Sequence, residues 1–168
     1  RMAIDYAINH NVVVVAAAGN CGNSVLGACA GQTTGYVTFP AAYNKVIAVG
    51  AVDAVERRAS FSSYGQRVDI VAPGSGLLTS PTWSSANQTN GYSQQLYGTS
   101  FSAPIVSGSA ALLRSIDSFT PQETKALLLA SSHKTSRTGN LYSPEYGHGI
   151  LDVGLAASIA MDYHNALN

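Results

Sequence analysis

Charge is scarce in this sequence, and neither sign is in excess. Nine Lys and Arg residues balance nine Asp and Glu residues, and charged residues make up only 11% of the 168-residue chain. Nucleic acids and anionic membranes attract proteins through clusters of basic residues, so the composition argues against both as partners. Long apolar runs are missing as well: the longest, Val12 to Ala18, is far shorter than the roughly 20 residues that span a bilayer. The N-terminus does not resemble a signal peptide.

Cysteine is equally scarce, because Cys21 and Cys29 are the only two in the chain. Two cysteines without a nearby histidine cannot complete a four-ligand zinc site, and they lack the spacing of a redox Cys-x-x-Cys motif. The glycine-bearing segment between them can fold back and close a disulfide, which is the pairing we predict; two reduced, buried thiols are the alternative. A disulfide indicates an oxidising compartment, so we expect an extracellular protein.

Apolar residues and glycine are abundant. Hydrophobic residues make up 46% of the chain, which also holds 16 glycines, a composition typical of a packed globular protein rich in tight turns. The length fits one domain or a piece of one. The apolar pattern predicts an opening helix and then parallel-type strands, the first of them continuously buried. The helix is expected over Met2 to Ile8, and the strands over Val12 to Ala17, Val46 to Val52 and Arg67 to Val71, the last ending at Ala72-Pro73-Gly74.

Two long polar segments, 19–44 and 75–90, separate these elements and are expected to be loops, the first of a length that usually marks a functional one. From Ser100 onward the apolar residues follow a helical period among small residues, which predicts a buried helix.

Two further helices carry capping patterns. Thr120, Pro121 and Glu123 form the sequence of a capping box with proline at the first helical position, and three consecutive leucines then face the core. Asp152 is expected to cap a final helix that runs to Ala160.

Two polar residues stand at positions suited to chemistry. Ser100 lies in Gly98-Thr99-Ser100 at the start of a helix, where free backbone N–H groups favour developing negative charge, so it is a candidate nucleophile. Asn20 follows a buried strand, at the edge where α/β proteins gather their ligand sites, and its amide could donate to an oxyanion. Taken singly, Ser100 could be a helix cap and Asn20 a turn residue.

Six segments in one order, however, resemble the subtilisin-like serine protease (subtilase) family over nearly the whole chain. They are Val14-Val-Ala-Ala-Ala-Gly-Asn20, Val46-Ile-Ala-Val-Gly-Ala-Val-Asp53, Ala59-Ser-Phe-Ser-Ser-Tyr-Gly65, Val71-Ala-Pro-Gly74, Gly98-Thr-Ser100 and Tyr146-Gly-His-Gly-Ile-Leu-Asp152. The resemblance implies an α/β, three-layer fold with a mainly parallel central sheet. It also implies that residues 1–168 are the C-terminal portion of the peptidase domain.

The resemblance also assigns roles in a serine endopeptidase. Ser100 would attack the scissile carbonyl to form an acyl-enzyme, while the Asn20 side chain and the Ser100 N–H stabilise the oxyanion. Substrate would contact five residues: Ala17, Ala18, Gly19, Thr38 and Thr99. Thr38 stands where many relatives have glycine, which predicts a shallower pocket that prefers small or medium side chains. Phe101 replaces the methionine usual after the nucleophile, which predicts slower acylation and resistance to peroxide.

The catalytic aspartate and histidine that the family requires are not found in this sequence. Upstream of Ser100 the only histidine is His10, and Asp5 and His10 lack the family's surrounding motifs, so we expect both on a helix surface. The expected partner is therefore the N-terminal portion of the same protease, and protein or peptide is the expected substrate. Without that portion the strands would lack neighbours, so we predict that this chain does not fold independently.

The chemistry requires no cofactor and no catalytic metal. A structural calcium ion is conceivable at Asp69 with carbonyls near Ala41, Tyr43 and Val46, a weak cation site in some relatives; a plain solvent-facing carboxylate is the alternative. Two other functions stay open: a catalytically inactive interaction or regulatory module derived from the family, and an enzyme that transfers the acyl group to an amine.

Overall fold

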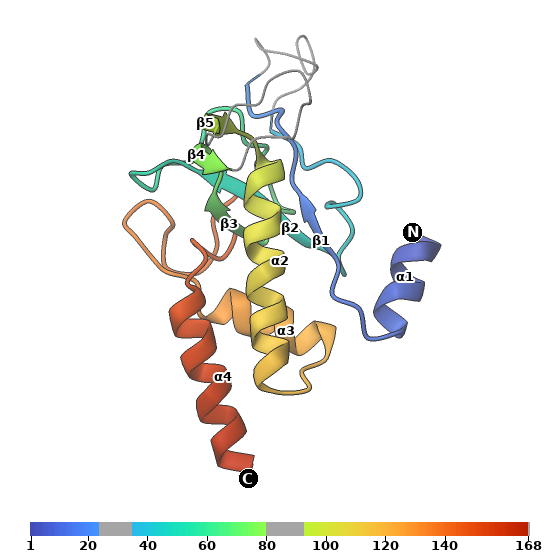
Figure 1. The fold of residues 1–168 in the computed structure, drawn as a ribbon. Helices are drawn as coiled ribbons and strands as arrows, with labels where there is room; N and C mark the ends of the chain where they lie inside the picture. Colours follow the sequence, from blue (N-terminus) through green and yellow to red (C-terminus); the bar gives the residue numbers. More distant parts are fainter. Residues whose placement is uncertain (24–34, 80–92, 168) are drawn as a thin grey trace, which may run out of the picture.

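Four helices and five strands make up the part of the chain described by the computed structural model, which comprises residues 1–23, 35–79 and 93–167. In order they are α1 (Met2–Asn9), β1 (Val15–Ala17), β2 (Ile47–Val52), β3 (Ile70–Pro73), β4 (Ser75–Thr79), β5 (Ser93–Tyr97), α2 (Thr99–Ile116), α3 (Pro121–Ala130) and α4 (Val153–Leu167) (Figure 1). The predicted α/β class is confirmed. None of the helices in these residues combines the length and apolar character needed to cross a bilayer.

The central sheet is parallel and has the order β1-β2-β3. Val15 pairs with Ile47, and Val49 pairs with Ile70. All of β2 is buried, because it lies between two strands and both of its faces are covered. β1 is only half-buried. The prediction of a buried strand over residues 12–17 is therefore wrong in extent and burial, because β1 lies at the edge of the sheet formed by the described residues.

Helices cover one face of this sheet. α2 packs against all three strands, and α3 and α4 pack against α2 (Figure 1). Their shared core contains Ile47, Val49, Ile70, Val106, Leu113, Leu128, Ala156 and Ala160. Non-helical segments pack on the opposite face, where Val37, Ala41, Tyr146 and Ile150 surround Ala48 and Val71.

The predicted helix caps are confirmed. Thr120 Oγ1 accepts a hydrogen bond from the Glu123 N–H at 3.3 Å, and Glu123 Oε2 accepts one from the Thr120 N–H at 2.8 Å. Asp152 Oδ1 accepts from the Leu155 N–H at 2.8 Å. Of the three leucines in α3, Leu128 is fully buried and its two neighbours are partly buried against the core.

Three expectations about elements are wrong. Residues 75–79 form a strand rather than a loop, because β4 pairs antiparallel with β5. α2 is not buried all round: Ile105 and Leu112 are 36% and 44% exposed, since no described layer covers that side of the helix. α4 continues beyond Ala160 to Leu167.

Candidate active site

Asn20 follows the carboxyl end of β1 after a short turn. Gly19 adopts φ 111°, a conformation that side chains disfavour, and this turns the chain out of the sheet. The Gly19 N–H donates to Thr99 Oγ1 at 3.3 Å, which ties the turn to the first residue of α2. Asn20 itself is exposed.

Ser100 is the second residue of α2, immediately after the junction with β5. Gly98 makes this junction with φ 150° and ψ 148°, a backbone conformation essentially confined to glycine. The Ser100 side chain is exposed. Its N–H belongs to the first turn of the helix, whose N–H groups have no acceptor within the helix.

The carboxyl end of β3 holds the start of α2 in place. Ser102 Oγ lies 3.1 Å from both Ala72 O and Pro73 O, and the Gly98 N–H donates to Gly74 O at 2.9 Å. Only glycine fits at position 74, because a Cβ there would lie 2.3 Å from Ser102 Oγ. The ends of two parallel strands thus meet at the start of α2, where α/β proteins place their ligands.

The amide of Asn20 is oriented by Thr99. Asn20 Oδ1 lies 3.0 Å from the Thr99 backbone N and 2.9 Å from Thr99 Oγ1. A backbone N–H can only donate, so the amide atom facing it must be the oxygen. The Nδ2 group therefore points away from Thr99 and is left to donate elsewhere.

Asn20 Nδ2 and the Ser100 N–H approach the same region. A Cβ built on Gly98 would lie 3.5 Å from Asn20 Nδ2 and 3.7 Å from Ser100 N. Two hydrogen-bond donors thus lie near one point at the start of α2, next to the exposed Ser100.

The residues expected to contact substrate lie around this junction with different exposures. Ala18 is fully buried, whereas Ala17, Gly19 and Thr38 are partly exposed. The Thr38 N–H and Oγ1 both donate to Ala18 O, at 2.9 and 3.2 Å, so Thr38 lies against the Ala18–Gly19 backbone. The Thr99 side chain is only 1% exposed and contacts Asn20, so its role in this arrangement is to orient that amide.

No histidine serves Ser100 within this chain: none of the hydrogen bonds among the described residues joins the two. His10 donates from Nδ1 to Tyr6 O in α1, and Asp5 pairs with Lys45 at 2.8 Å. Both residues lie on the helix surface, as expected. The Lys45 ammonium lowers the pKa of the Asp5 carboxyl below its usual value.

Asp69 is not a plain solvent-facing carboxylate. Its Oδ2 accepts from the Ala48 N–H at 2.8 Å and from Lys125 Nζ at 2.8 Å. The same ammonium lies 2.9 Å from Val46 O and 3.2 Å from Asn44 O. A lysine from α3 therefore supplies a positive charge at the place where a calcium ion was conceivable. The described residues contain no cluster of three or more acidic, His or Cys side chains that could hold a metal.

Cys21 is buried, and Cys29 lies outside the described residues, so their disulfide stays a prediction. The sequence pattern did not reveal the supporting roles of two residues. Thr99 was expected to touch substrate, and Ser63, which contacts both neighbours of Asn20, stood out only as part of a motif. The surrounding segment, residues 56–67, is rich in polar and charged residues, so its pattern did not indicate that Ser62 and Ser63 are buried.

Comparison with known proteins identifies the family. The sequence profile of the Subtilase family matches residues 1–149. The chain belongs to the subtilase family. It is 39% identical over 158 residues to subtilisin DY of Bacillus licheniformis and 42% identical over 146 residues to a thermophilic serine proteinase of Bacillus sp. (strain AK1). Among solved structures, the self-cleaved protease domain of PatA superimposes with a TM-score of 0.70 and 32% identity.

These matches cover most of this chain but only part of each relative. They span 94% of the chain and 51% of subtilisin DY, 86% and 31% for the thermophilic proteinase, and 96% and 54% for the PatA domain. The chain thus spans about half the length of subtilisin DY and of the PatA domain, and the fold predicted from the resemblance is confirmed.

Proposed function

We propose that this chain is the nucleophile-bearing, C-terminal portion of a subtilisin-like serine endopeptidase. The observation that carries the proposal is that Asn20 Nδ2 and Ser100 N lie close to one point beside Gly98, next to the exposed Ser100. Ser100 Oγ attacks the carbonyl carbon of the scissile peptide and gives its proton to a base. The C–N bond breaks, the amine leaves with that proton, and water hydrolyses the acyl-enzyme.

The two donors act on the charge that develops in this reaction. As the carbonyl oxygen becomes negative, it would accept from Asn20 Nδ2 and the Ser100 N–H. Their orientation is fixed beforehand, because Thr99 holds the amide and helix α2 holds the backbone. In subtilisin itself, removal of the corresponding amide donor costs about 10²–10³ in turnover, and the same loss is expected for Asn20→Ala.

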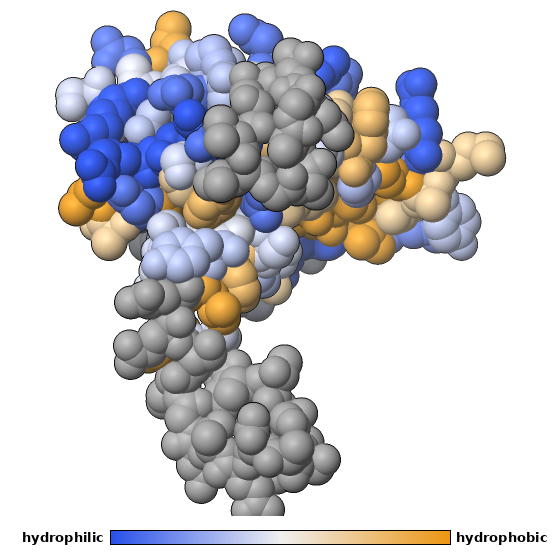
Figure 2. Space-filling model, turned by 90° about the horizontal axis from the view of Figure 1, so that it is seen from above, coloured by the Kyte–Doolittle hydropathy of each residue, from blue (hydrophilic) through white to orange (hydrophobic). Residues whose placement is uncertain are grey.

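The general base and its orienting carboxylate come from the N-terminal portion of the same protease in this proposal. The surfaces left open in this chain support such a partner. A groove of about 280 Å³ runs between β1 and α2, lined by Val12, Val13, Val15, Ala110 and Ala111 among others. Figure 2 shows hydrophobic surface on the side of the molecule where α1 lies.

Labelling of Ser100 tests the catalytic role. In the assembled protease, a fluorophosphonate probe should attach to Ser100 within minutes, and mass spectrometry of the labelled peptide identifies the residue. Ser100→Ala is the control and should not be labelled. An assembled protease that stays unlabelled would favour the alternative of a non-catalytic module. Products containing an added amine would instead indicate acyl transfer.

Thr38 is the residue proposed to limit the substrate side chain before the cut. Its side chain lies against the Ala18–Gly19 backbone, where it takes space that glycine would leave open. Profiling with a peptide library should show preference for small or medium side chains, and Thr38→Gly should extend it to larger ones. Efficient cleavage after tryptophan by the parent protein would contradict this assignment.

A disulfide between Cys21 and Cys29 and an extracellular location complete the proposal. Among the described residues no cysteine is free, which supports the pairing. Peptide mapping without reduction should recover the two cysteines in one linked species. Alkylation of both thiols in the unreduced protein would contradict the pairing.

A further inference from the structure

Ser63 holds the residues on either side of Asn20. Its N–H donates to Gly19 O at 2.9 Å, and its Oγ accepts from the Cys21 N–H at 3.1 Å. Ser63 is fully buried, so water does not compete for these two bonds. The backbone of the Asn20 turn is thereby fixed both before and after the amide-bearing residue.

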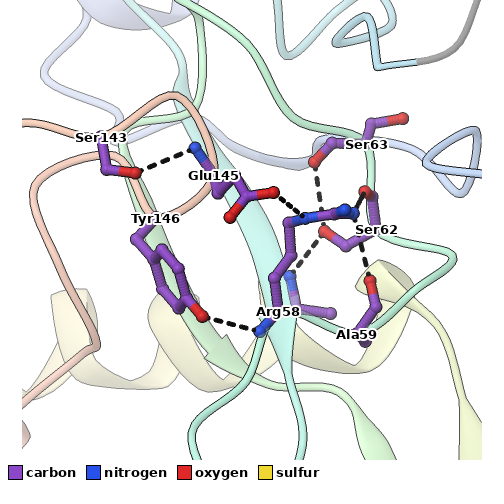
Figure 3. Close-up of polar contacts among 8 residues, drawn as sticks. Arg58, Ala59, Ser62, Ser63, Ser143, Glu145 and Tyr146 are labelled. Carbon is purple, nitrogen blue, oxygen red and sulfur yellow. Dashed lines mark hydrogen bonds and ion pairs between the residues drawn. The ribbon is translucent and has the colours of Figure 1, made fainter. Parts of the chain in front are cut away.

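The segment that carries Ser63 is itself anchored. Ser62 Oγ accepts from the Ala51 N–H of β2 at 2.9 Å and donates to Ser63 O at 3.1 Å. Arg58 Nη1 donates to Ser62 O at 2.7 Å, and Arg58 Nε pairs with Glu145 at 3.3 Å (Figure 3). Because these contacts tie the segment to β2, Ser63 has a fixed position relative to the sheet and holds the Asn20 turn in that position.

Two independent supports thus act on Asn20. Thr99 contacts the side-chain amide from α2, and Ser63 contacts the backbone from the segment after β2. We propose that Ser63 is a positioning residue of the active site, which keeps the Asn20 amide donor aimed at the developing oxyanion. This inference rests on the proposed protease function and assigns a role beyond the nucleophile and its donors.

A double-mutant cycle with Asn20 tests the inference in the assembled protease. Ser63→Ala leaves the Cys21 N–H without its acceptor, and kcat should fall about 10-fold with KM little changed, the size expected for one lost buried hydrogen bond. In the Asn20→Ala background the same substitution should change kcat by less than about twofold, because the donor that Ser63 positions is already absent. A purely structural role would reduce kcat equally in both backgrounds.

Thr138→Val is the matched control. Thr138 is also buried, and its Oγ1 also accepts from a backbone N–H, that of Thr135 at 2.8 Å, but both residues lie between α3 and α4 and not in the Asn20 turn or the segment that holds it. This substitution should lower the melting temperature about as much as Ser63→Ala while keeping kcat within about twofold of the parent. If Ser63→Ala does not fold, Ser63→Gly, which also removes the hydroxyl, and its combination with Asn20→Ala replace it in the cycle.

The outcomes separate this inference from the proposed function. If the parent reacts with fluorophosphonate and Ser63→Ala keeps the parental kcat, or loses it equally with and without Asn20, the positioning role is wrong and the protease function stands. If the parent itself neither reacts nor cleaves peptides, the proposed function is wrong and the positioning role falls with it.

Discussion

At the scale of single residues, the direction of one amide decides what Asn20 can do. The Asn20 side chain could point either its oxygen or its nitrogen toward a substrate, and only the nitrogen can donate to an oxyanion. Thr99 settles the choice by offering two donors to Oδ1. Thr99, the residue before the proposed nucleophile Ser100, thus orients the Asn20 amide.

Replacing Thr99 with valine should reduce catalysis without unfolding the protein. Valine keeps the shape of the side chain but removes the hydroxyl that donates to Asn20 at 2.9 Å. Loss of this hydrogen bond should lower kcat about 3–10-fold at nearly constant KM. Steady-state kinetics of the assembled protease measure the effect. Thr99→Ser, which retains the hydroxyl, should stay close to the parent; an unchanged kcat for Thr99→Val would argue against the orienting role.

We expect Phe101 to determine how the site responds to oxidants. No sulfur adjoins Ser100 at this position, and the two methionines of the chain, Met2 and Met161, are exposed in α1 and α4. The parent protease should keep its activity after peroxide, whereas Phe101→Met should lose activity as a sulfoxide forms beside the nucleophile. Before peroxide, Phe101→Met should acylate faster, because a flexible side chain crowds Ser100 less. Equal sensitivity of both proteins would contradict the first expectation, and equal acylation rates the second.

At the scale of elements, α3 is held in place by a local cap and by a long-range ion pair. The capping box stabilises the N-terminal end of the helix through Thr120 and Glu123, while Lys125 reaches from the middle of the helix to the loop before β2 and to Asp69, the residue before β3. The cap joins neighbours in the sequence, whereas the ion pair depends on tertiary packing. Each gives a separate prediction.

Removal of the capping box should destabilise α3 in a pH-dependent way. The backbone N–H and the hydroxyl of Thr120 lower the pKa of Glu123 below its usual value. A lowered pKa in the folded state stabilises the fold above the ordinary glutamate pKa, about 4.3, and this contribution is lost as pH falls through the folded value. Thr120→Ala should therefore lower the stability of the assembled protease near neutral pH, and the difference from the parent should shrink in acid. Urea unfolding at several pH values measures both.

Lys125 should make the Asp69 cluster independent of calcium. Replacing it with methionine leaves the carboxylate, with the carbonyls of Asn44 and Val46 nearby, without a positive charge. We expect a melting temperature lower by a few degrees, and partial recovery on addition of millimolar calcium, since calcium prefers such oxygen ligands. The parent protein should not gain from calcium through this cluster. A similar gain in the parent and in Lys125→Met would show that the lysine does not replace the ion.

At the scale of the whole molecule, apolar surface is covered on one side of the described residues and partly exposed on another. The face of the sheet under α2, α3 and α4 is a continuous core, whereas β1 is a half-buried edge and α2 exposes Ile105 and Leu112. An edge strand and apolar helix positions of this kind are usually covered in a stable protein.

The chain expressed alone should therefore fail to fold cooperatively. We expect a broad urea transition, association on size-exclusion chromatography and no reaction of Ser100 with fluorophosphonate. Addition of the N-terminal portion of the protease should sharpen the transition and restore labelling. A monomeric, cooperatively unfolding chain by itself would contradict this expectation.

The sequence by itself determined what depends on near neighbours along the chain. Three features involve residues within about four positions of each other and could therefore be predicted from the sequence. They are the capping box of Thr120 and Glu123, the cap at Asp152 and the helical start at Ser100. The strand over residues 46–52 was predicted from a β-branched apolar run and is observed at Ile47–Val52, whereas the strand predicted over residues 67–71 is observed at Ile70–Pro73. Residues 75–79 were missed because none of the residues of this short strand is buried, so it carries no such pattern.

Only the tertiary structure decided the contacts that make the site. Asn20 and Thr99 are separated by 79 positions, Cys21 and Ser63 by 42, and Asp69 and Lys125 by 56. No local pattern specifies such pairs, because the first two form only after the parallel strands bring their carboxyl ends to one edge of the sheet, and the third joins α3 to the residue before β3. The sequence thus specified which groups are available for chemistry, and packing of the sheet against α2 decided which of them face each other.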